Sequence, residues 1–213
     1  MRTRLPLTFF FLPLFFSVFL HAQKDSTLYS PDFKFKEGIY LSFADFISNR
    51  PIPKSSIISN NDKNEMDFLR KEMTTRLINY TDSTGKLQTV VPYKLWGFSE
   101  NNSVYIHYNS DFNKIVVIGS LCHFTATYTS YMTTGPMTGG VGVGTPVESI
   151  QQYVLDMKTG MVMDFVLPNM EIIFQRDPDL YKEFMALRKG KRKQLLFFYL
   201  RKYNDRHPLY FYP

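Results

Sequence analysis

The sequence predicts an α+β fold: a mainly antiparallel, meandering β-sheet with short N-terminal helices and a C-terminal helix packed on it. Apolar and polar residues alternate with period two over much of residues 87–167, and turn-forming residues interrupt the pattern, as in consecutive half-buried strands. A helix start signal, Asp177 followed by Pro178, then opens a stretch with apolar residues at helical spacing. Strands followed by helices are typical of this class.

The first 22 residues have the composition of a secretory signal peptide. Arg2 and Arg4 precede an apolar run over residues 5–20, and Ala22 stands at the expected cleavage point. The run contains two prolines and is shorter than the roughly 20 residues of a membrane-spanning helix, which favours cleavage over a permanent anchor. The sequence therefore predicts an exported protein, which is periplasmic, associated with the cell envelope or secreted.

After the signal peptide we expect a polar leader over residues 23–36 and a single α+β domain over residues 37–213. The domain is long enough to bury its own core. Cys122 is the single cysteine of the chain, so no intramolecular disulfide forms and the stability of the fold depends on packing.

In the N-terminal part, residues 38–41 are predicted to form a short strand. Ser42 is the expected N-cap of a short helix, with Asp45 three residues later. A short helix is expected to begin at residues 60–62 and to extend through Met73, because residues 66, 69, 73 and 77 are apolar at helical spacing, although Thr74, Thr75 and Ile78 also suit a strand. We then expect strands at 87–98, 104–108, 115–120, 122–133, 147–157 and 161–167.

Adjacent residues of a strand point to opposite faces, so the neighbours Cys122 and His123 do not form a thiol–imidazole pair. We expect Cys122 to be a buried apolar thiol, and His107 and His123 to be half-exposed strand residues. The histidines of the mature chain, including His207, have no second ligand at metal-binding spacing. Acid pairs such as Asp177 and Asp179 suit helix capping. We therefore predict no cofactor, no metal and no enzymatic activity.

Basic residues are concentrated near the C-terminus, where eight Lys or Arg accompany one acid, Asp205, from position 188 onward. The densest cluster of these cations, at residues 188–193, is a candidate binding surface. The alternative is that the cluster is simply the solvent-exposed face of a helix. Gly190 is a point at which the C-terminal helix could divide. The candidate surface consists of Arg188, Lys189, Lys191, Arg192 and Lys193.

A glycine-rich loop is expected over residues 134–146. A strand follows it instead of a helix, and the loop has no lysine, so a phosphate-binding loop is excluded. Two interpretations stay open: a hairpin tip, or a binding loop. The glycines concerned are Gly135, Gly139, Gly140, Gly142 and Gly144.

Several phrases resemble uncharacterised exported proteins of Gram-negative bacteria. They are EGIYLSFADF at 37–46, KLWGF at 94–98 with VYI at 104–106, YVLDMKTG at 153–160 and KYNDR at 202–206. The resemblance implies an envelope location and no activity or site residues.

Three functions are consistent with these observations. The leading hypothesis is a non-enzymatic binding or interaction module of the cell envelope, whose partner is an envelope protein or glycan. The first alternative is peripheral membrane or anionic-glycan binding through the basic C-terminal segment. The second is a hydrolase whose residues are distant in sequence. Export disfavours nucleic acid as a partner, and the oligomeric state is left open.

Overall fold

The computed structural model describes residues 26–133 and 144–212. A central eight-stranded sheet has the spatial order β12-β11-β10-β9-β8-β7-β2-β3 within this part of the chain. Its paired strands are antiparallel, and β7 to β12 form the predicted meander, which confirms the fold class. Its strands are β2 (Gly38–Tyr40), β3 (Ile52–Pro53), β7 (Gly97–Glu100), β8 (Ser103–Tyr108), β9 (Asp111–Val117), β10 (Leu121–Thr133), β11 (Gly144–Asp156) and β12 (Met161–Asp164).

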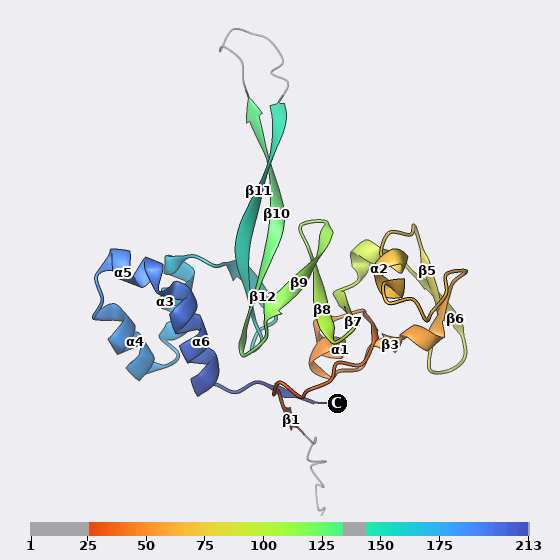
Figure 1. Ribbon diagram of the computed structural model, residues 1–213, viewed down its shortest axis with the longest axis horizontal. Helices are drawn as coiled ribbons and strands as arrows, with labels where there is room; N and C mark the ends of the chain where they lie inside the picture. The colour runs from red at the N-terminus through yellow and green to blue at the C-terminus, as the bar shows by residue number, and fades with distance from the viewer. Residues whose placement is uncertain (1–25, 134–143, 213) are drawn as a thin grey trace, which may run out of the picture.

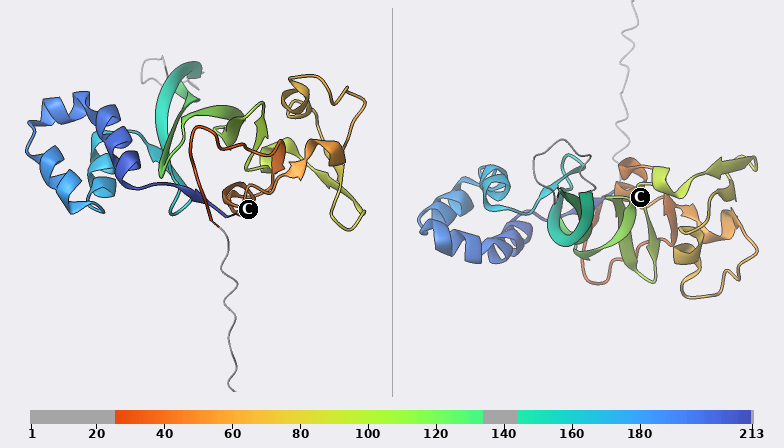
Figure 2. Two further views of the ribbon diagram at one scale, coloured as in Figure 1. Left: turned by 60° about the horizontal axis from the view of Figure 1, so that its bottom comes forward. Right: turned by 90° about the horizontal axis from the view of Figure 1, so that it is seen from above.

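The other elements lie around this sheet. A small sheet contains β4 (Ile57–Ile58), β5 (Ile78–Thr81) and β6 (Leu87–Val90), and β1 (Thr27–Leu28) pairs with β13 (Tyr210–Phe211). The helices are α1 (Phe43–Ile47), α2 (Phe68–Glu72), α3 (Leu167–Phe174), α4 (Pro178–Met185), α5 (Lys189–Gln194) and α6 (Leu196–Arg206), with 3-10 turns η1 (Lys54–Ser56) and η2 (Pro92–Lys94). Helices α3–α6 lie to one side of the central sheet, and β4–β6 with α2 lie to the other (Figure 1). Figure 2 shows the same order from two further directions.

Two helix starts confirm the local signals in the sequence. Ser42 and Asp45 form a complete capping box at α1, in which each side chain bonds the backbone N–H of the other residue. Asp177 caps α4 by accepting a hydrogen bond from the N–H of Leu180, and Pro178 is the first helical residue. These signals depend on residues a few positions apart, so they act regardless of the surrounding fold.

Several predicted elements are wrong in extent. The strand expected over 87–98 is two strands in different sheets, because Pro92 begins η2 between them and cannot donate a ladder hydrogen bond. The strand expected to end at Leu167 ends at Asp164, and α3 follows. Of the helix expected over 62–73, α2 is the α-helical part. The C-terminal helix is three helices, and its breaks fall at residues 186–188 and at Leu195 instead of Gly190.

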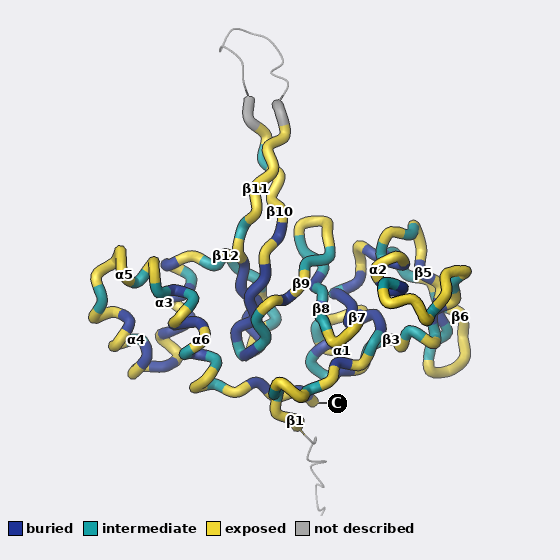
Figure 3. The backbone as a smooth tube through the Cα atoms, viewed as in Figure 1, coloured by how far each residue is buried: buried dark blue, intermediate teal, exposed yellow. Residues whose placement is uncertain are grey.

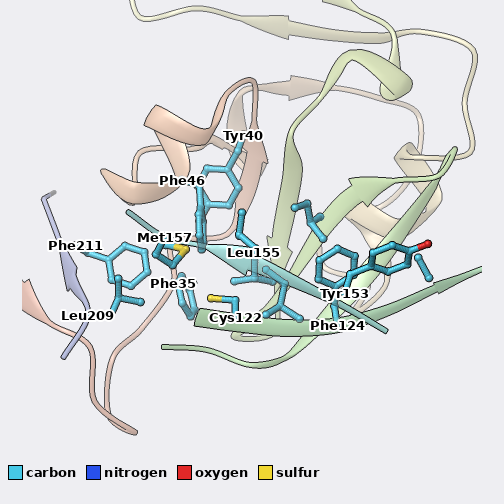
Figure 4. Close-up of a cluster of buried hydrophobic side chains, with 14 residues drawn as sticks. Phe35, Tyr40, Phe46, Cys122, Phe124, Tyr153, Leu155, Met157, Leu209 and Phe211 are labelled. Atoms are coloured by element: carbon cyan, nitrogen blue, oxygen red, sulfur yellow. The ribbon is translucent and has the colours of Figure 1, made fainter. Parts of the chain in front are cut away.

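The central sheet separates two hydrophobic cores. On one face, Cys122 and Phe124 of β10 pack with Tyr153 and Leu155 of β11 against aromatic residues of the terminal segments, including Phe211 (Figure 4). Cys122 is fully buried, as predicted. Burial raises the pKa of its thiol to about 12, so the thiol stays protonated at neutral pH.

The opposite face of the same strands supports the helices. Leu121 and Val154 are fully buried against α3, α4 and α6. A third cluster lies beneath the small sheet and α2 and includes Phe68, Ile78 and Phe98. Neighbouring residues of β10 and β11 therefore serve different cores.

The outer half of the β10–β11 hairpin leaves both cores. Its backbone changes from buried at the base to largely exposed farther out (Figure 3). Side chains on both faces are exposed there: Tyr131 and Ile150 are 72% and 78% exposed on one face, and Tyr128 and Val147 are 44% and 37% exposed on the other. The ribbon therefore projects into solvent without a hydrophobic layer of its own.

The side chain of Asn204 on α6 hydrogen-bonds the backbone at the edge of β10. The Oδ1 atom of Asn204 accepts the N–H of Leu121 at 2.8 Å, and its Nδ2 atom donates to the Leu121 carbonyl at 2.9 Å. Asn204 thus replaces a neighbouring strand for one residue. A Cβ at Gly119 would lie 2.4 Å from the Cγ atom of Asn204, so this approach requires glycine.

We expect Asn204→Ala to lower the free energy of unfolding by about 2 to 4 kcal/mol, because two backbone groups of buried Leu121 lose their partners. Asn79 is a matched control, since it is exposed and accepts one hydrogen bond from the Thr89 hydroxyl. Asn79→Ala should cost less than about 1 kcal/mol. Urea denaturation followed by circular dichroism measures both, and equal losses would contradict this role of Asn204.

Candidate functional site

The basic segment forms α5 (Lys189–Gln194), a short helix with Arg188 before its first residue and Leu195 after its last. Gly190 lies on its exposed side, where an added Cβ would meet no atom within 4 Å. The helix buries none of its residues, so most of its cations face solvent, as expected for a charged surface. It follows α4 and precedes α6 in the chain. In Figure 1 it lies on the side of the helical group that is away from the central sheet.

One side of α5 borders a cleft of about 630 Å³, a volume in the range of small-molecule sites. Lys189 and Lys193, four residues apart, supply its cations. The cleft also contains Gln152 of β11 and Glu171 of α3. Its apolar lining consists of Phe165, Val166, Leu167, Pro168, Leu196 and Phe197.

Arg192 has a structural role, unlike the other cations of the segment. Its Nη1 atom lies 2.6 Å from the Oε1 atom of Glu171, and its guanidinium stands over the ring of Phe184 at 5.9 Å. The ion pair holds α5 against α3. It also neutralises Glu171, the carboxylate that lines the cleft, so this group repels an anion less.

The remaining cations of the predicted surface differ from Arg192 in their surroundings. Within residues 26–133 and 144–212, the side chains of Arg188, Lys189, Lys191 and Lys193 have no ion-pair or hydrogen-bond partner. Two of these, Lys189 and Lys193, line the cleft, whereas Arg188 and Lys191 do not. The structure therefore divides the basic segment into a cleft pair, an outer pair and one structural arginine.

His123 lies beneath the cleft and is 5% exposed, so its prediction as a half-exposed residue is wrong. Its Nε2 atom lies 3.0 Å from the Oε1 atom of Gln152, and its ring meets Phe165 and Phe197 edge-on at 5.0 and 5.1 Å between centroids. All three partners line the cleft. Its Nδ1 atom is buried without a partner among the described residues. Burial lowers the pKa of His123, which favours the neutral ring at pH 7.

The other histidines lie elsewhere. His107 is half-buried on β8 and packs against Phe112. The Nε2 atom of His207, just beyond α6, lies 2.9 Å from the Oδ2 atom of Asp177. Arg206 also bonds this carboxylate and holds its pKa well below the usual range, so Asp177 serves as a helix cap and charge partner. No three His, Cys, Asp or Glu residues converge as a metal site in the described chain.

The glycine-rich loop lies mostly outside the described residues, including Gly135, Gly139, Gly140 and Gly142. Gly144 is described and begins β11 opposite Thr133. The candidate binding loop therefore stays a prediction.

Sequence reasoning missed the apolar wall of the cleft. Phe165 follows β12 and Phe197 lies on α6, more than thirty residues later in the chain. The run Leu195–Leu200 could have indicated this wall. A helix segment that is apolar on all its sides usually packs against more than one neighbouring element.

Fold and cleft together define an α+β protein with a basic, apolar-walled surface site. The chain belongs to a family of unknown function (DUF6563), whose model matches residues 38–207. No curated protein matches the chain, and no solved structure matches it. Among the described residues, no helix has both the length and the apolar character needed to cross a membrane.

We expect His123 to make stability depend on pH. Its folded-state pKa lies below the unfolded value of about 6.5, so the unfolded chain binds more protons as the pH falls through that value. The free energy of unfolding should therefore decrease from about pH 7 to about pH 5. His107 acts in the same direction, whereas Glu100, whose pKa burial raises, acts in the opposite direction.

The variant His123→Leu should lose less stability than the wild type over the same pH interval, because the shifted group is absent and the other groups are unchanged. Denaturant unfolding at both pH values measures the difference within each protein, which removes the cost of the substitution itself. Lys191→Gln serves as an exposed control and should follow the wild type. An unchanged pH dependence in His123→Leu would show that its ring is accessible to protons in the fold.

Proposed function

We propose that this protein is a non-enzymatic, exported binding module of the cell envelope and that the cleft beside α5 takes an anionic amphiphile, a ligand with an acidic group and an apolar portion. The observation that carries the proposal is the position of two ammonium groups, those of Lys189 and Lys193, on an apolar cleft, where neither has an ion-pair partner among the described residues. Export is supported by the composition of residues 1–22 and by the resemblance to exported proteins of Gram-negative bacteria.

The two parts of the cleft suit the two parts of such a ligand. The lysines would attract the acidic group, and the ion pair between Arg192 and Glu171 leaves no uncompensated carboxylate to oppose it. Phe165 and Phe197 would cover the apolar portion, whose burial contributes about 25 cal/mol per Å² removed from water. A purely polar anion would gain only the weak, screened attraction of exposed lysines.

A second candidate function rests on the outer cations. Arg188 and Lys191 are exposed and unpaired in the described chain, which suits contact with an anionic membrane surface or an acidic glycan. This contact would not require the cleft. The hydrolase hypothesis has less support, because the carboxylate beside His207 already pairs with Arg206.

We expect decanoate to bind more tightly than either acetate or decanol, because acetate lacks the apolar chain and decanol lacks the charge. Isothermal titration calorimetry of the purified protein measures all three. Lys189→Gln and Lys193→Gln should each weaken decanoate binding about twofold to fivefold, the effect of losing an ion pair of up to about 1 kcal/mol. Added salt should weaken it further.

Lys191→Gln is the matched control, since it removes an equal charge from the same helix but outside the cleft. It should leave decanoate binding within about twofold of the wild type. Equal losses in all three variants would indicate nonspecific attraction and contradict the cleft as the site. Sedimentation with anionic vesicles tests the second candidate function, for which Lys191→Gln and Arg188→Gln should be the weakening variants.

A further inference from the structure

The outer half of the β10–β11 hairpin is a two-stranded ribbon with two open edges. Strand β9 pairs with His123 and Phe124 at the base of β10, and β12 pairs with residues 153–156 of β11. Beyond these positions the two strands pair with each other and with no other strand in the described chain. A two-stranded ribbon is marginally stable in water, and three or more strands are usually needed.

Contacts along β10 show which of its backbone groups face the open edge. Both the N–H and the carbonyl of Leu121 point away from β11, because they bond Asn204. The Thr127 carbonyl also faces this side and accepts a long hydrogen bond of 3.4 Å from Asn109. Backbone direction alternates along a strand, so the odd-numbered residues of β10 present their N–H and carbonyl groups to the open edge.

The same reasoning identifies the outward residues of β11. The carbonyl of Gln152 accepts the N–H of Phe165 at 2.9 Å on the β12 side, so the even-numbered residues face that edge. They include Pro146, which has no N–H to donate, and Glu148, which carries a charge. Proline and charged residues are the usual protection of an edge strand against pairing with another chain.

The edge of β10 has no such protection. Its outward residues Thr127, Thr129 and Tyr131 are neutral, keep their N–H groups and favour strands. The ribbon segments 125–133 and 144–152 contain a single charged residue, Glu148, which lies opposite Thr129 on the protected edge. Two copies that meet through β10 would therefore experience no like-charge repulsion along the shared edge.

We propose that this protein forms a two-fold symmetric dimer in which the β10 edges of two copies pair antiparallel and join the two ribbons into a four-stranded sheet. Thr129 of one copy lies opposite Thr129 of the other at the two-fold axis, and Thr127 lies opposite Tyr131. This arrangement is self-complementary, as an isologous interface requires. The N–H of Tyr131 replaces the long contact from Asn109 to the Thr127 carbonyl.

Sedimentation velocity of the purified protein over a wide concentration range tests the dimer. We expect a dimer for the wild type and a monomer for Thr129→Lys, which brings two like charges together at the axis. Thr129→Pro should also give a monomer, because it removes an outward N–H that the β10–β11 ladder does not use. Glu148→Lys, a charge change of the cross-strand neighbour on the other edge, should remain a dimer.

Circular dichroism spectra that match the wild type show that the monomeric variants are folded. A wild type that is monomeric throughout the concentration range would overturn the proposal. Dissociation caused equally by Glu148→Lys would also overturn it, since the backbone groups of Glu148 point to the edge opposite the proposed contact.

Oxidative crosslinking tests the register. Residues opposite each other in a hydrogen-bonded antiparallel pair have Cα atoms about 5.5 Å apart, within the range for a disulfide. Thr129→Cys should therefore form a covalent dimer under mild oxidation, and Glu148→Cys should not. The buried native thiol of Cys122 does not compete. Crosslinking through Glu148→Cys in place of Thr129→Cys would place the contact on the other edge and overturn the proposal.

Discussion

The burial of both faces at the base of β10 and β11 is the constraint on which the rest of the structure depends. Cys122 and Leu155 face the core of the terminal segments, whereas their neighbours Leu121 and Val154 face the helices. All four are fully buried, so the strand period of two assigns each residue to one core. A one-residue slip of this pair would exchange the two sets of side chains and disrupt both cores at once.

The same pair of strands also determines what projects from the molecule. A strand covered on both faces at its base cannot change its pairing, so β10 and β11 leave the cores in fixed register. Farther out the side chains are exposed, and the backbone ladder holds the two strands together with cross-strand hydrogen bonds from the Ser130 and Ser149 hydroxyls. Asn204 lies at the base of β10, where it satisfies the backbone of Leu121 at the edge that α6 covers. Strand β9 pairs with the next residues, His123 and Phe124; beyond them no strand of the described chain pairs with this edge, whose outward residues are neutral.

The parts of the fold that were predictable from sequence depend on nearby residues. The capping box of Ser42 and Asp45 and the Asp177–Pro178 helix start act within one turn, and the alternating pattern from Cys122 onward gave a strand of nearly the observed length. Elements that depend on distant partners were not predictable. The alternation of apolar and polar residues identified Cys122 as buried. It gave no indication that helices would also cover His123, because Phe197, which packs on its ring, lies much later in the sequence.

The candidate site shows why a charge run does not by itself define a binding surface. The sequence presents Arg188, Lys189, Lys191, Arg192 and Lys193 as equivalent cations, but their environments differ. Arg192 is bound to Glu171, twenty-one positions earlier. This pairing neutralises a carboxylate that would otherwise repel anions, and it also holds α5 against α3. Lys189 and Lys193 share one helical side because they are four residues apart, and α3 and α6 place an apolar wall on that side. The spacing of the lysines is a property of the sequence, whereas the wall, and with it any preference for an amphiphile over a simple anion, is a property of the fold.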